Sequence, residues 1–292
     1  MKLYYHKDTK GNFGDDLNPF IWRHYFPNLI DGEIYHEPKI RQPIAPDDVL
    51  LIGIGTLLNE HIPANIKKYI FGSGMGYGAD PSVDKSWEFI CVRGPLTANK
   101  LNLDSALAIT DPAILLPDVR PRTSLSEGKV GFIPHCSTAD VNIWEKLSGE
   151  VGLLYISPRQ DSQRFLELLW KCDWVITEAM HGAIVADAYR IPWVSVKTHQ
   201  EVLEFKWMDW CESLKLIYRP EKLPSFWQVA EQENIGLRKR FIRRIKIKQT
   251  MALLQKLRYE QNVQLSHEDI YRSKQDRLLS KVDWLQRNLS NA

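Results

Sequence analysis

The segment WVITEAMHGAIVADAYRIPWVSV, residues 174–196, decides the fold class of this 292-residue chain. It opens with an apolar run, Trp174–Thr177, that is typical of a buried strand. A turn and a helix rich in small residues, His181–Tyr189, follow, and Pro192 stops the helix. A second apolar run, Trp193–Val196, comes directly after the proline. Strand, helix and strand in this order predict a βαβ unit and therefore a parallel sheet.

The same alternation of short apolar runs and amphipathic segments extends through the first 220 residues. A helix is expected over Asp161–Lys171, where Asp161 can act as the N-cap. The loop 117–128, rich in Pro, Ser and acidic residues, divides the pattern into two series. We therefore predict two α/β lobes, residues 1–125 and 126–226, with a cleft between them. The further expected strands are Lys2–His6, Val49–Gly53, Ile70–Ser73, Phe89–Val92, Ala106–Ile109, Lys129–Pro134, Gly152–Ile156 and Lys215–Tyr218.

The last part of the chain, residues 227–292, shows no βα pattern and is expected to be a basic helical extension. Two helices, Trp227–Gln261 and His267–Leu289, would cover it. Residues 231–292 carry 14 Lys and Arg against 7 Asp and Glu, whereas the other 230 residues have a net charge of −5. This asymmetry indicates that the extension faces an anionic partner.

Composition limits the classes of protein that the chain can belong to. Hydrophobic residues make up 44% and charged residues 25%, as in soluble globular proteins. No apolar stretch reaches the roughly 18 residues of a membrane-spanning helix, and the first residues lack the apolar core of a secretory signal. The four cysteines are widely spaced and form no CxxC pair, so reduced thiols and a cytoplasmic location are expected. No His, Asp and Glu cluster suggests a metal site, and no cofactor is expected.

Two kinds of glycine-containing loop follow predicted strands. In the first, residues 11–18, Gly11 and Gly14 would let backbone N–H groups approach a ligand, and Asp15 or Asp16 opens a helix. Asn12 and Gly14 of this loop are candidates for substrate binding. The second kind comprises the glycine clusters 53–56 and 72–78, where Gly55 and Gly74 could present N–H groups to a phosphate or carboxylate. Neither cluster matches a Walker A or a GxGxxG fingerprint. Tight turns explain these glycines equally well.

Three further strand ends carry cationic or titratable side chains. Arg93 lies between a predicted strand and a helix that starts near Pro95, which suits an anion-binding arginine. His181 and Gly182 lie at the N-terminal end of the helix in the opening segment, where an anion would meet the positive end of the helix dipole. His135 lies at another strand end. Each residue also has a non-functional interpretation. Arg93 would then be a surface arginine, His181 a structural histidine and His135 an exposed loop histidine.

The ordered set of these motifs resembles the polysaccharide pyruvyl transferase family, and in particular the branch that acts on acidic exopolysaccharides such as succinoglycan. The resemblance covers about residues 1–220. Many members have Arg-Leu-His-Gly where this chain has Ala179-Met180-His181-Gly182, so an arginine is missing, and Lys197 or Lys206 would have to replace it. The motifs are Asn12–Asp16, Gly53–Leu58, Val92–Thr97, Asp111–Ala113 and Met180–Ile184, followed by Ile191 and Pro192.

The resemblance implies two Rossmann-like lobes of GT-B-like arrangement. It also implies transfer of a pyruvyl group from phosphoenolpyruvate to two hydroxyls of a sugar, in a polysaccharide or its lipid-linked precursor, which yields a cyclic ketal and phosphate. Arg93 and His181 would hold phosphoenolpyruvate from opposite lobes. The residues available as general acid and base are Asp15, Asp16, His135, Glu178 and His181. No metal is required.

Two other functions stay open at this point. A GT-B-type glycosyltransferase would use the same fold with a nucleotide sugar. A non-catalytic scaffold of a polysaccharide assembly complex would use only the surface.

Two segments suggest further contacts. The segment 205–210 combines Lys206 with Trp207 and Trp210, which suits either sugar stacking or a helix with a tryptophan core. The segment 238–248 packs seven cations among apolar residues, which suits peripheral contact with an anionic membrane, or a helix that packs on the protein. Nucleic acid is not expected as a partner, because the body of the chain is net negative.

Overall fold

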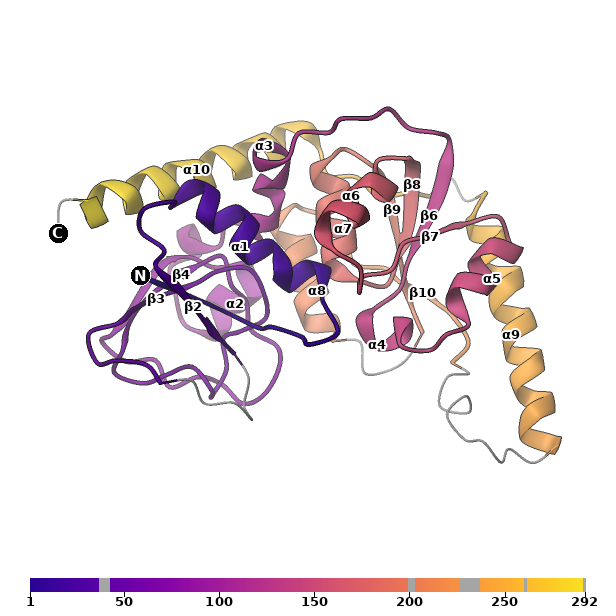
Figure 1. Ribbon diagram of the computed structural model, residues 1–292, viewed down its shortest axis with the longest axis horizontal. Helices are drawn as coiled ribbons and strands as arrows, with labels where there is room; N and C mark the ends of the chain where they lie inside the picture. Colours follow the sequence, from indigo (N-terminus) through magenta and orange to yellow (C-terminus); the bar gives the residue numbers. More distant parts are fainter. Residues whose placement is uncertain (37–42, 199–202, 226–236, 260–261, 291–292) are drawn as a thin grey trace. The chain divides into compact units, whose positions relative to one another are not determined.

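The structure is a computed structural model that describes all residues except 37–42, 199–202, 226–236, 260–261 and 291–292. Its contacts group into two compact units (Figure 1). Unit 1 contains residues 1–121, 203–218 and 266–292, and unit 2 contains residues 122–202 and 219–265. Each unit holds a parallel sheet flanked by helices, which confirms the α/β class and is compatible with two Rossmann-like lobes. The domain limits 1–125, 126–226 and 227–292, and the GT-B-like cleft, stay predictions.

Unit 1 is built on a five-stranded sheet with the strand order β2-β1-β3-β4-β5. All four pairs in it are parallel. The loops after β1, β3, β4 and β5 therefore meet at one edge of the sheet. The strands are β1 (Lys2–Tyr5), β2 (Gly32–Tyr35), β3 (Val49–Ile52), β4 (Lys67–Phe71) and β5 (Trp87–Cys91). The helices are α1 (Phe13–Tyr25), α2 (Pro95–Lys100), α3 (Leu116–Val119), α8 (Glu204–Ser213) and α10 (Glu268–Ser290), with 3-10 turns at Ser105–Leu107 and Pro112–Leu115.

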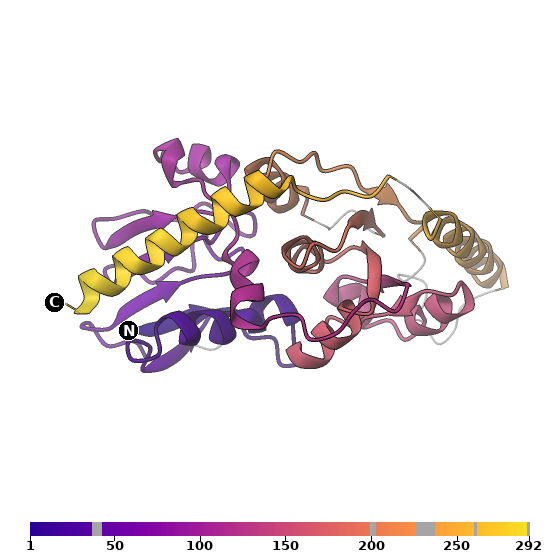
Figure 2. The same ribbon diagram turned by 90° about the horizontal axis from the view of Figure 1, so that it is seen from above.

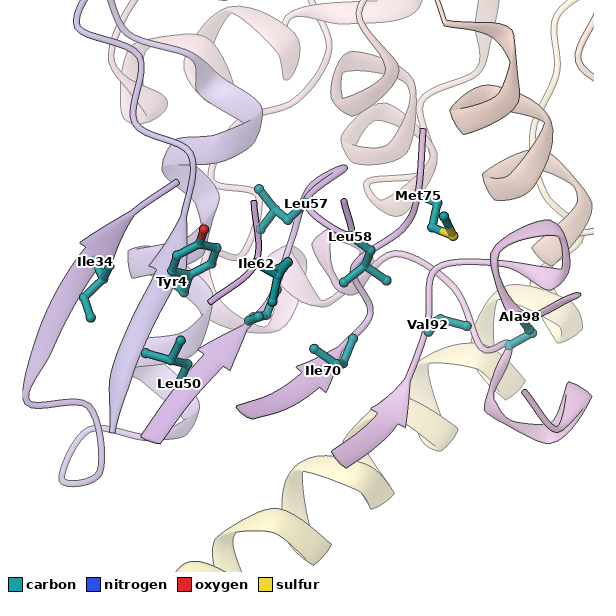
Figure 3. Packing of buried hydrophobic residues seen from close by; sticks show 12 residues of the cluster. Tyr4, Ile34, Leu50, Leu57, Leu58, Ile62, Ile70, Met75, Val92 and Ala98 are labelled. Carbon is teal, nitrogen blue, oxygen red and sulfur yellow. The ribbon is translucent and has the colours of Figure 1, made fainter. Parts of the chain in front are cut away.

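A buried apolar cluster fixes these loops to the sheet (Figure 3). Strand residues such as Leu50 and Ile70 pack with Leu57 and Leu58 from the loop after β3, and with Met75 from the loop after β4. Full burial of a side chain of this size contributes about 1.5–3 kcal/mol. The glycine clusters are thus held between anchored neighbours.

Unit 2 is built on a second five-stranded sheet with the order β10-β9-β8-β6-β7. Its pairs are also parallel. The strands are β6 (Lys129–Ile133), β7 (Leu154–Tyr155), β8 (Cys172–Thr177), β9 (Trp193–Lys197) and β10 (Glu221–Lys222). The helices are α4 (Cys136–Ala139), α5 (Trp144–Glu150), α6 (Ser162–Leu169), α7 (Met180–Ala188) and α9 (Leu237–Leu257). The βαβ unit of the opening segment is therefore confirmed as β8, α7 and β9.

Two predicted strands are wrong, and two short strands, β2 and β10, escaped prediction. Residues 106–109 were expected to form a strand, but the Asp104 side chain accepts from the Ala106 N–H and caps a 3-10 turn over Ser105–Leu107, so that Ala108 forms only an isolated parallel bridge with Val92. Residues 215–218 do not form a strand either, because Lys215 has a φ of 58° and turns the chain after α8. The short strand β2 has a single fully buried apolar residue, Ile34, and gives almost no pattern.

The C-terminal helices contact different units. Helix α10 packs along unit 1 (Figure 2), where the Tyr271 hydroxyl donates to the Ile114 carbonyl at 3.2 Å and Gln275 donates to Asp118. Helix α9 packs in unit 2, where Leu254 and Leu257 join the core with Phe132. The predicted start of the first helix at Trp227 lies outside the described residues. None of the helices described combines the length and apolar character that crossing a lipid bilayer requires.

Candidate active site

The glycine-containing loop that begins at Gly11 forms a compact polar turn at the start of α1. The Asn12 side chain accepts from the Gly14 N–H at 3.2 Å and so acts as the N-cap, while its amide nitrogen donates to the Asp15 carboxylate. The Asp16 carboxylate pairs with Lys7 and accepts from the Asn12 N–H at 3.4 Å. Asp15 and Asp16 are both partly exposed, so both carboxylates remain candidates for proton transfer.

Asn18, which the sequence interpretation missed, ties α1 to the loop after β3. Its side chain accepts from the Ile54 N–H and donates to the Ile54 carbonyl, both at 2.9 Å, and it is fully buried. The Trp22 Nε1 donates to the same side-chain oxygen at 3.2 Å. A Cβ on Gly53 would lie 2.0 Å from that nitrogen, so this position requires glycine. The signal in the sequence was a polar residue within the apolar face of α1.

Arg93 lies at the end of β5, as predicted, but its side chain points into the protein. The guanidinium is fully buried and donates to the Asp209 carboxylate at 3.0 Å, to the Thr56 hydroxyl at 2.9 Å and to the Met75 carbonyl at 2.9 Å. It therefore joins the ends of β3, β4 and β5 to α8. The alternative of a surface arginine is excluded by its burial, and direct contact with a ligand would require these partners to exchange.

Asp209 completes this network at the start of α2. Its carboxylate accepts from the Thr97 N–H at 2.9 Å and from the Thr97 hydroxyl at 2.6 Å, besides its bond with Arg93. A negative charge at the N-terminus of a helix interacts favourably with the helix dipole. Asp209 is fully buried and therefore removed from solvent.

The two glycine clusters are hydrogen-bonded to each other. The Gly74 N–H donates to the Gly55 carbonyl at 3.0 Å, and the Ser73 hydroxyl donates to the same carbonyl at 3.1 Å. A Cβ on Gly74 would lie 2.3 Å from the Arg93 Cζ atom. Gly74 therefore makes room for the buried arginine, and its N–H is not available to a phosphate in this structure.

Lys206 and Trp207 lie on α8 in unit 1. The Lys206 ammonium donates to the Tyr77 hydroxyl at 3.0 Å and is largely buried. Trp207 is fully buried and stacks on Tyr218 with ring centroids 5.0 Å apart. These contacts match the interpretation of α8 as a helix with a tryptophan core, and they leave no exposed face of Trp207 for a sugar.

In unit 2, Glu178 links the ends of three strands. Its carboxylate accepts from the His135 N–H at 3.1 Å, after β6, and from the Thr198 N–H at 2.8 Å, after β9. The Thr198 hydroxyl donates to the same carboxylate. Glu178 follows β8 and is fully buried. Its oxygens are thus occupied by neighbouring loops, which suits a positioning role better than proton transfer with substrate.

His181 and Gly182 occupy the first turn of α7, as the sequence indicated. A Cβ on Gly182 would lie 2.6 Å from the Thr177 Oγ1 atom, so this glycine lets the helix pack against the end of β8. His181 is partly exposed. Lys197, one of the two lysines proposed to replace the missing arginine, ends β9 in the same unit.

His135 caps the short helix α4. Its Nδ1 lies 2.8 Å from the Ser137 Oγ, and the imidazole is partly exposed. The structure thus places Asn12, Gly14, Asp15, Asp16, Gly55, Gly74, Arg93, Lys206 and Trp207 in unit 1, and His135, Glu178, His181 and Gly182 in unit 2. Within the described part of the chain, no group of three or more His, Cys, Asp or Glu side chains is arranged to hold a metal ion.

Comparison with known proteins adds two findings. Residues 3–200 match the family model described as polysaccharide pyruvyl transferase. The chain is also similar to the succinoglycan biosynthesis protein ExoV of Rhizobium meliloti (strain 1021), with 38% identity over 228 residues. That match covers 77% of this chain and 68% of the relative.

Proposed function

Because this chain belongs to the polysaccharide pyruvyl transferase family, we propose that it transfers a pyruvyl group from phosphoenolpyruvate to two hydroxyls of one sugar and releases phosphate. The family match over residues 3–200 carries this proposal, since it spans the main strands and loops of both sheets.

The donor is a small compound with a phosphate and a carboxylate, so its site needs cations and N–H donors. His181 offers an imidazole at the N-terminal turn of α7, where the backbone N–H groups and the helix dipole favour an anion. Lys197, at the end of the adjacent strand β9, would supply the cation that the missing arginine supplies in other members. We assign these residues to donor binding.

Arg93 acts on the donor indirectly in this proposal. Its guanidinium is held by Asp209, Thr56 and Met75 and shapes the loops after β3 and β4. The Asn12 and Gly14 turn, with Asp15 and Asp16, lies after β1 at the same edge of the sheet. Arg93 is therefore a positioning residue, and the partly exposed carboxylates next to Asn12 are candidates for proton transfer.

The chemistry needs one proton delivered and two removed. Protonation of C3 of phosphoenolpyruvate makes C2 electrophilic, and one sugar hydroxyl adds to C2 and loses its proton. The C2–O bond to phosphate then breaks, the second hydroxyl attacks C2, and its proton leaves with phosphate. Asp15, Asp16, His135 and His181 are the groups exposed enough to exchange these protons, whereas Glu178 is enclosed.

The acceptor in this proposal is a sugar of a polysaccharide or of its lipid-linked precursor. A lipid-linked acceptor lies at the membrane surface, and phosphoenolpyruvate is a cytoplasmic metabolite. The proposal therefore includes a cytoplasmic enzyme that contacts the inner face of the membrane peripherally.

Ligand-dependent thermal stability tests the donor assignment. Phosphoenolpyruvate at 100 times its dissociation constant should stabilise the protein by about 2.7 kcal/mol and raise the melting temperature, while UDP-sugars should not. The variant His181→Asn should lose most of this shift, and the variant His24→Asn, at the far end of α1, should keep it. Stabilisation by a UDP-sugar and none by phosphoenolpyruvate would support a glycosyltransferase instead.

A further inference from the structure

Helix α9 has two halves that differ in their surroundings. Its C-terminal half packs in unit 2, where Leu254 and Leu257 are buried in the core and Thr250 is fully buried. Its N-terminal half, residues 238–248, lies mostly in solvent. Figure 1 shows this end of the helix extending past α5. Packing on the protein therefore explains the second half of the helix and leaves the first half unexplained.

The exposed half carries large apolar side chains. Phe241 is 65% exposed, Ile242 is 40% exposed and Ile245 is 39% exposed. Phe241 and Ile245 are four residues apart and share one face of the helix, on the side away from Thr250 and Leu254. Large apolar side chains in water are costly, and a cluster of them marks a contact surface.

The same half is strongly cationic. Arg238, Arg240, Arg244 and Lys248 are exposed around the apolar pair Phe241 and Ile245. Helix α9 contains no Asp or Glu, and in the part of the chain that the structure describes, no acidic side chain pairs with these four cations. The charge is therefore available to an external anion. We define Arg238, Arg240, Phe241, Arg244, Ile245 and Lys248 as the α9 face.

We propose that the α9 face docks the enzyme on an anionic lipid surface. Apolar side chains between exposed cations suit insertion just below the headgroups, with the cations at the level of the lipid phosphates. A nucleic acid duplex would use the cations but would leave Phe241 and Ile245 without a partner. A protein partner would need acidic groups and an apolar surface arranged to match a single helix. The lipid surface fits both features at once.

This inference rests on the proposed function for its purpose, because a lipid-linked acceptor would be concentrated at the surface that the α9 face binds. The N-terminal half of α9 would lie along the membrane, while its second half anchors it to unit 2. The docking itself does not depend on catalysis and can be measured without substrate.

Vesicle flotation with the full-length protein tests the proposal. Vesicles of phosphatidylcholine alone are compared with vesicles containing phosphatidylglycerol, at low and high salt. We expect binding to the anionic vesicles at low salt and at least a tenfold lower partition coefficient at high salt. A charge variant with Arg238, Arg240, Arg244 and Lys248 changed to Gln, and an apolar variant with Phe241 and Ile245 changed to Ser, should each bind at least tenfold more weakly.

A matched control removes four exposed cations elsewhere. Lys85, Lys129, Lys146 and Lys222 are exposed and lie outside α9. Their change to Gln lowers the net charge by the same amount and should reduce binding less than twofold. Equal vesicle binding by the wild type and both α9 variants would overturn the proposal. So would tight binding of a DNA duplex that the charge variant loses and the apolar variant keeps, with no loss of vesicle binding in the apolar variant.

Phosphate release from phosphoenolpyruvate with a water-soluble acceptor separates docking from catalysis. Both α9 variants should keep the wild-type rate in this assay. No phosphate release by any of the proteins would contradict the proposed function, while the flotation result would still decide whether the α9 face binds lipid.

Discussion

Arg93 Nε and Asp209 Oδ2 lie 3.0 Å apart, and both side chains are fully buried within unit 1. The pair is enclosed by hydrogen bonds to Thr97, Thr56 and the Met75 carbonyl. Removing one partner of such a pair leaves a buried charge without compensation. The pair therefore organises the loops after β3, β4 and β5 around one fixed cation.

The variant Asp209→Asn should lose about 3–5 kcal/mol of unfolding free energy, because it leaves the Arg93 charge unpaired. Urea denaturation measures this loss. The double variant Arg93→Met with Asp209→Asn should lose clearly less than the sum of the two single variants, since both act on one interaction. Additive losses would show that the two side chains are not energetically coupled.

The variant Glu178→Gln should destabilise unit 2 by about 1–3 kcal/mol, because an amide nitrogen would face the His135 or the Thr198 N–H group and leave a buried donor without an acceptor. As a positioning residue, Glu178 should affect kcat without removing a limb of the pH–rate profile. The variant Glu145→Gln, at an exposed carboxylate of the same unit, is the control. Loss of the acidic limb in Glu178→Gln alone would restore the general-base assignment.

The variant Trp207→Ala should cost about 3–5 kcal/mol of stability, because it opens a cavity beside Tyr218. Trp207→Phe should keep most of the packing and leave the Michaelis constant for the acceptor unchanged. A folded Trp207→Phe protein with a several-fold higher constant for the acceptor would show that the indole contacts the sugar after all.

Much of the fold could be predicted because its signals are local. The apolar run at β8, the Asp161 cap of α6 and Pro192 after α7 each act within a few residues. The wrong strand at residues 106–109 also looked apolar, but the Asp104 side chain bonds to the backbone and turns the chain. Strand propensity alone could not reveal that this side-chain hydrogen bond competes with strand pairing.

The candidate site was harder to predict because its partners are distant in sequence. Asp209 lies 116 residues after Arg93, and the two meet only because α8 packs against α2. The rule that binding residues follow the carboxyl ends of parallel strands correctly placed Arg93 and Glu178 at those ends of the two sheets. It could not show that both side chains point inward, since burial depends on which helix returns to each unit.

Lys274 on α10 gives a pH-dependent prediction. Burial, with Arg277 and Lys215 nearby, lowers the pKa of Lys274 to about 8. The unfolded chain binds this proton up to its ordinary pKa of about 10.4, so the unfolding free energy should rise between pH 8 and pH 10. Lys274→Met should remove that part of the rise and stabilise the protein near pH 7 by on the order of 1 kcal/mol, after allowance for solvent screening.

Melting temperatures of Lys274→Met and wild type across pH 7 to 10 measure the difference. Lys85→Met, which changes an exposed lysine of the same unit, is the control and should follow the wild type. Parallel curves for all three proteins would contradict an unfavourable charge on Lys274.

The central claim is transfer of the pyruvyl group of phosphoenolpyruvate to a pair of sugar hydroxyls. Proton NMR of the acceptor, incubated with phosphoenolpyruvate and the full-length enzyme, tests it most directly when phosphate is measured in the same sample. We expect a new methyl singlet of the ketal and one phosphate released for each ketal formed, with both signals much reduced in His181→Asn. Phosphate release without a methyl signal on the acceptor, or sugar transfer from a nucleotide sugar, would contradict it.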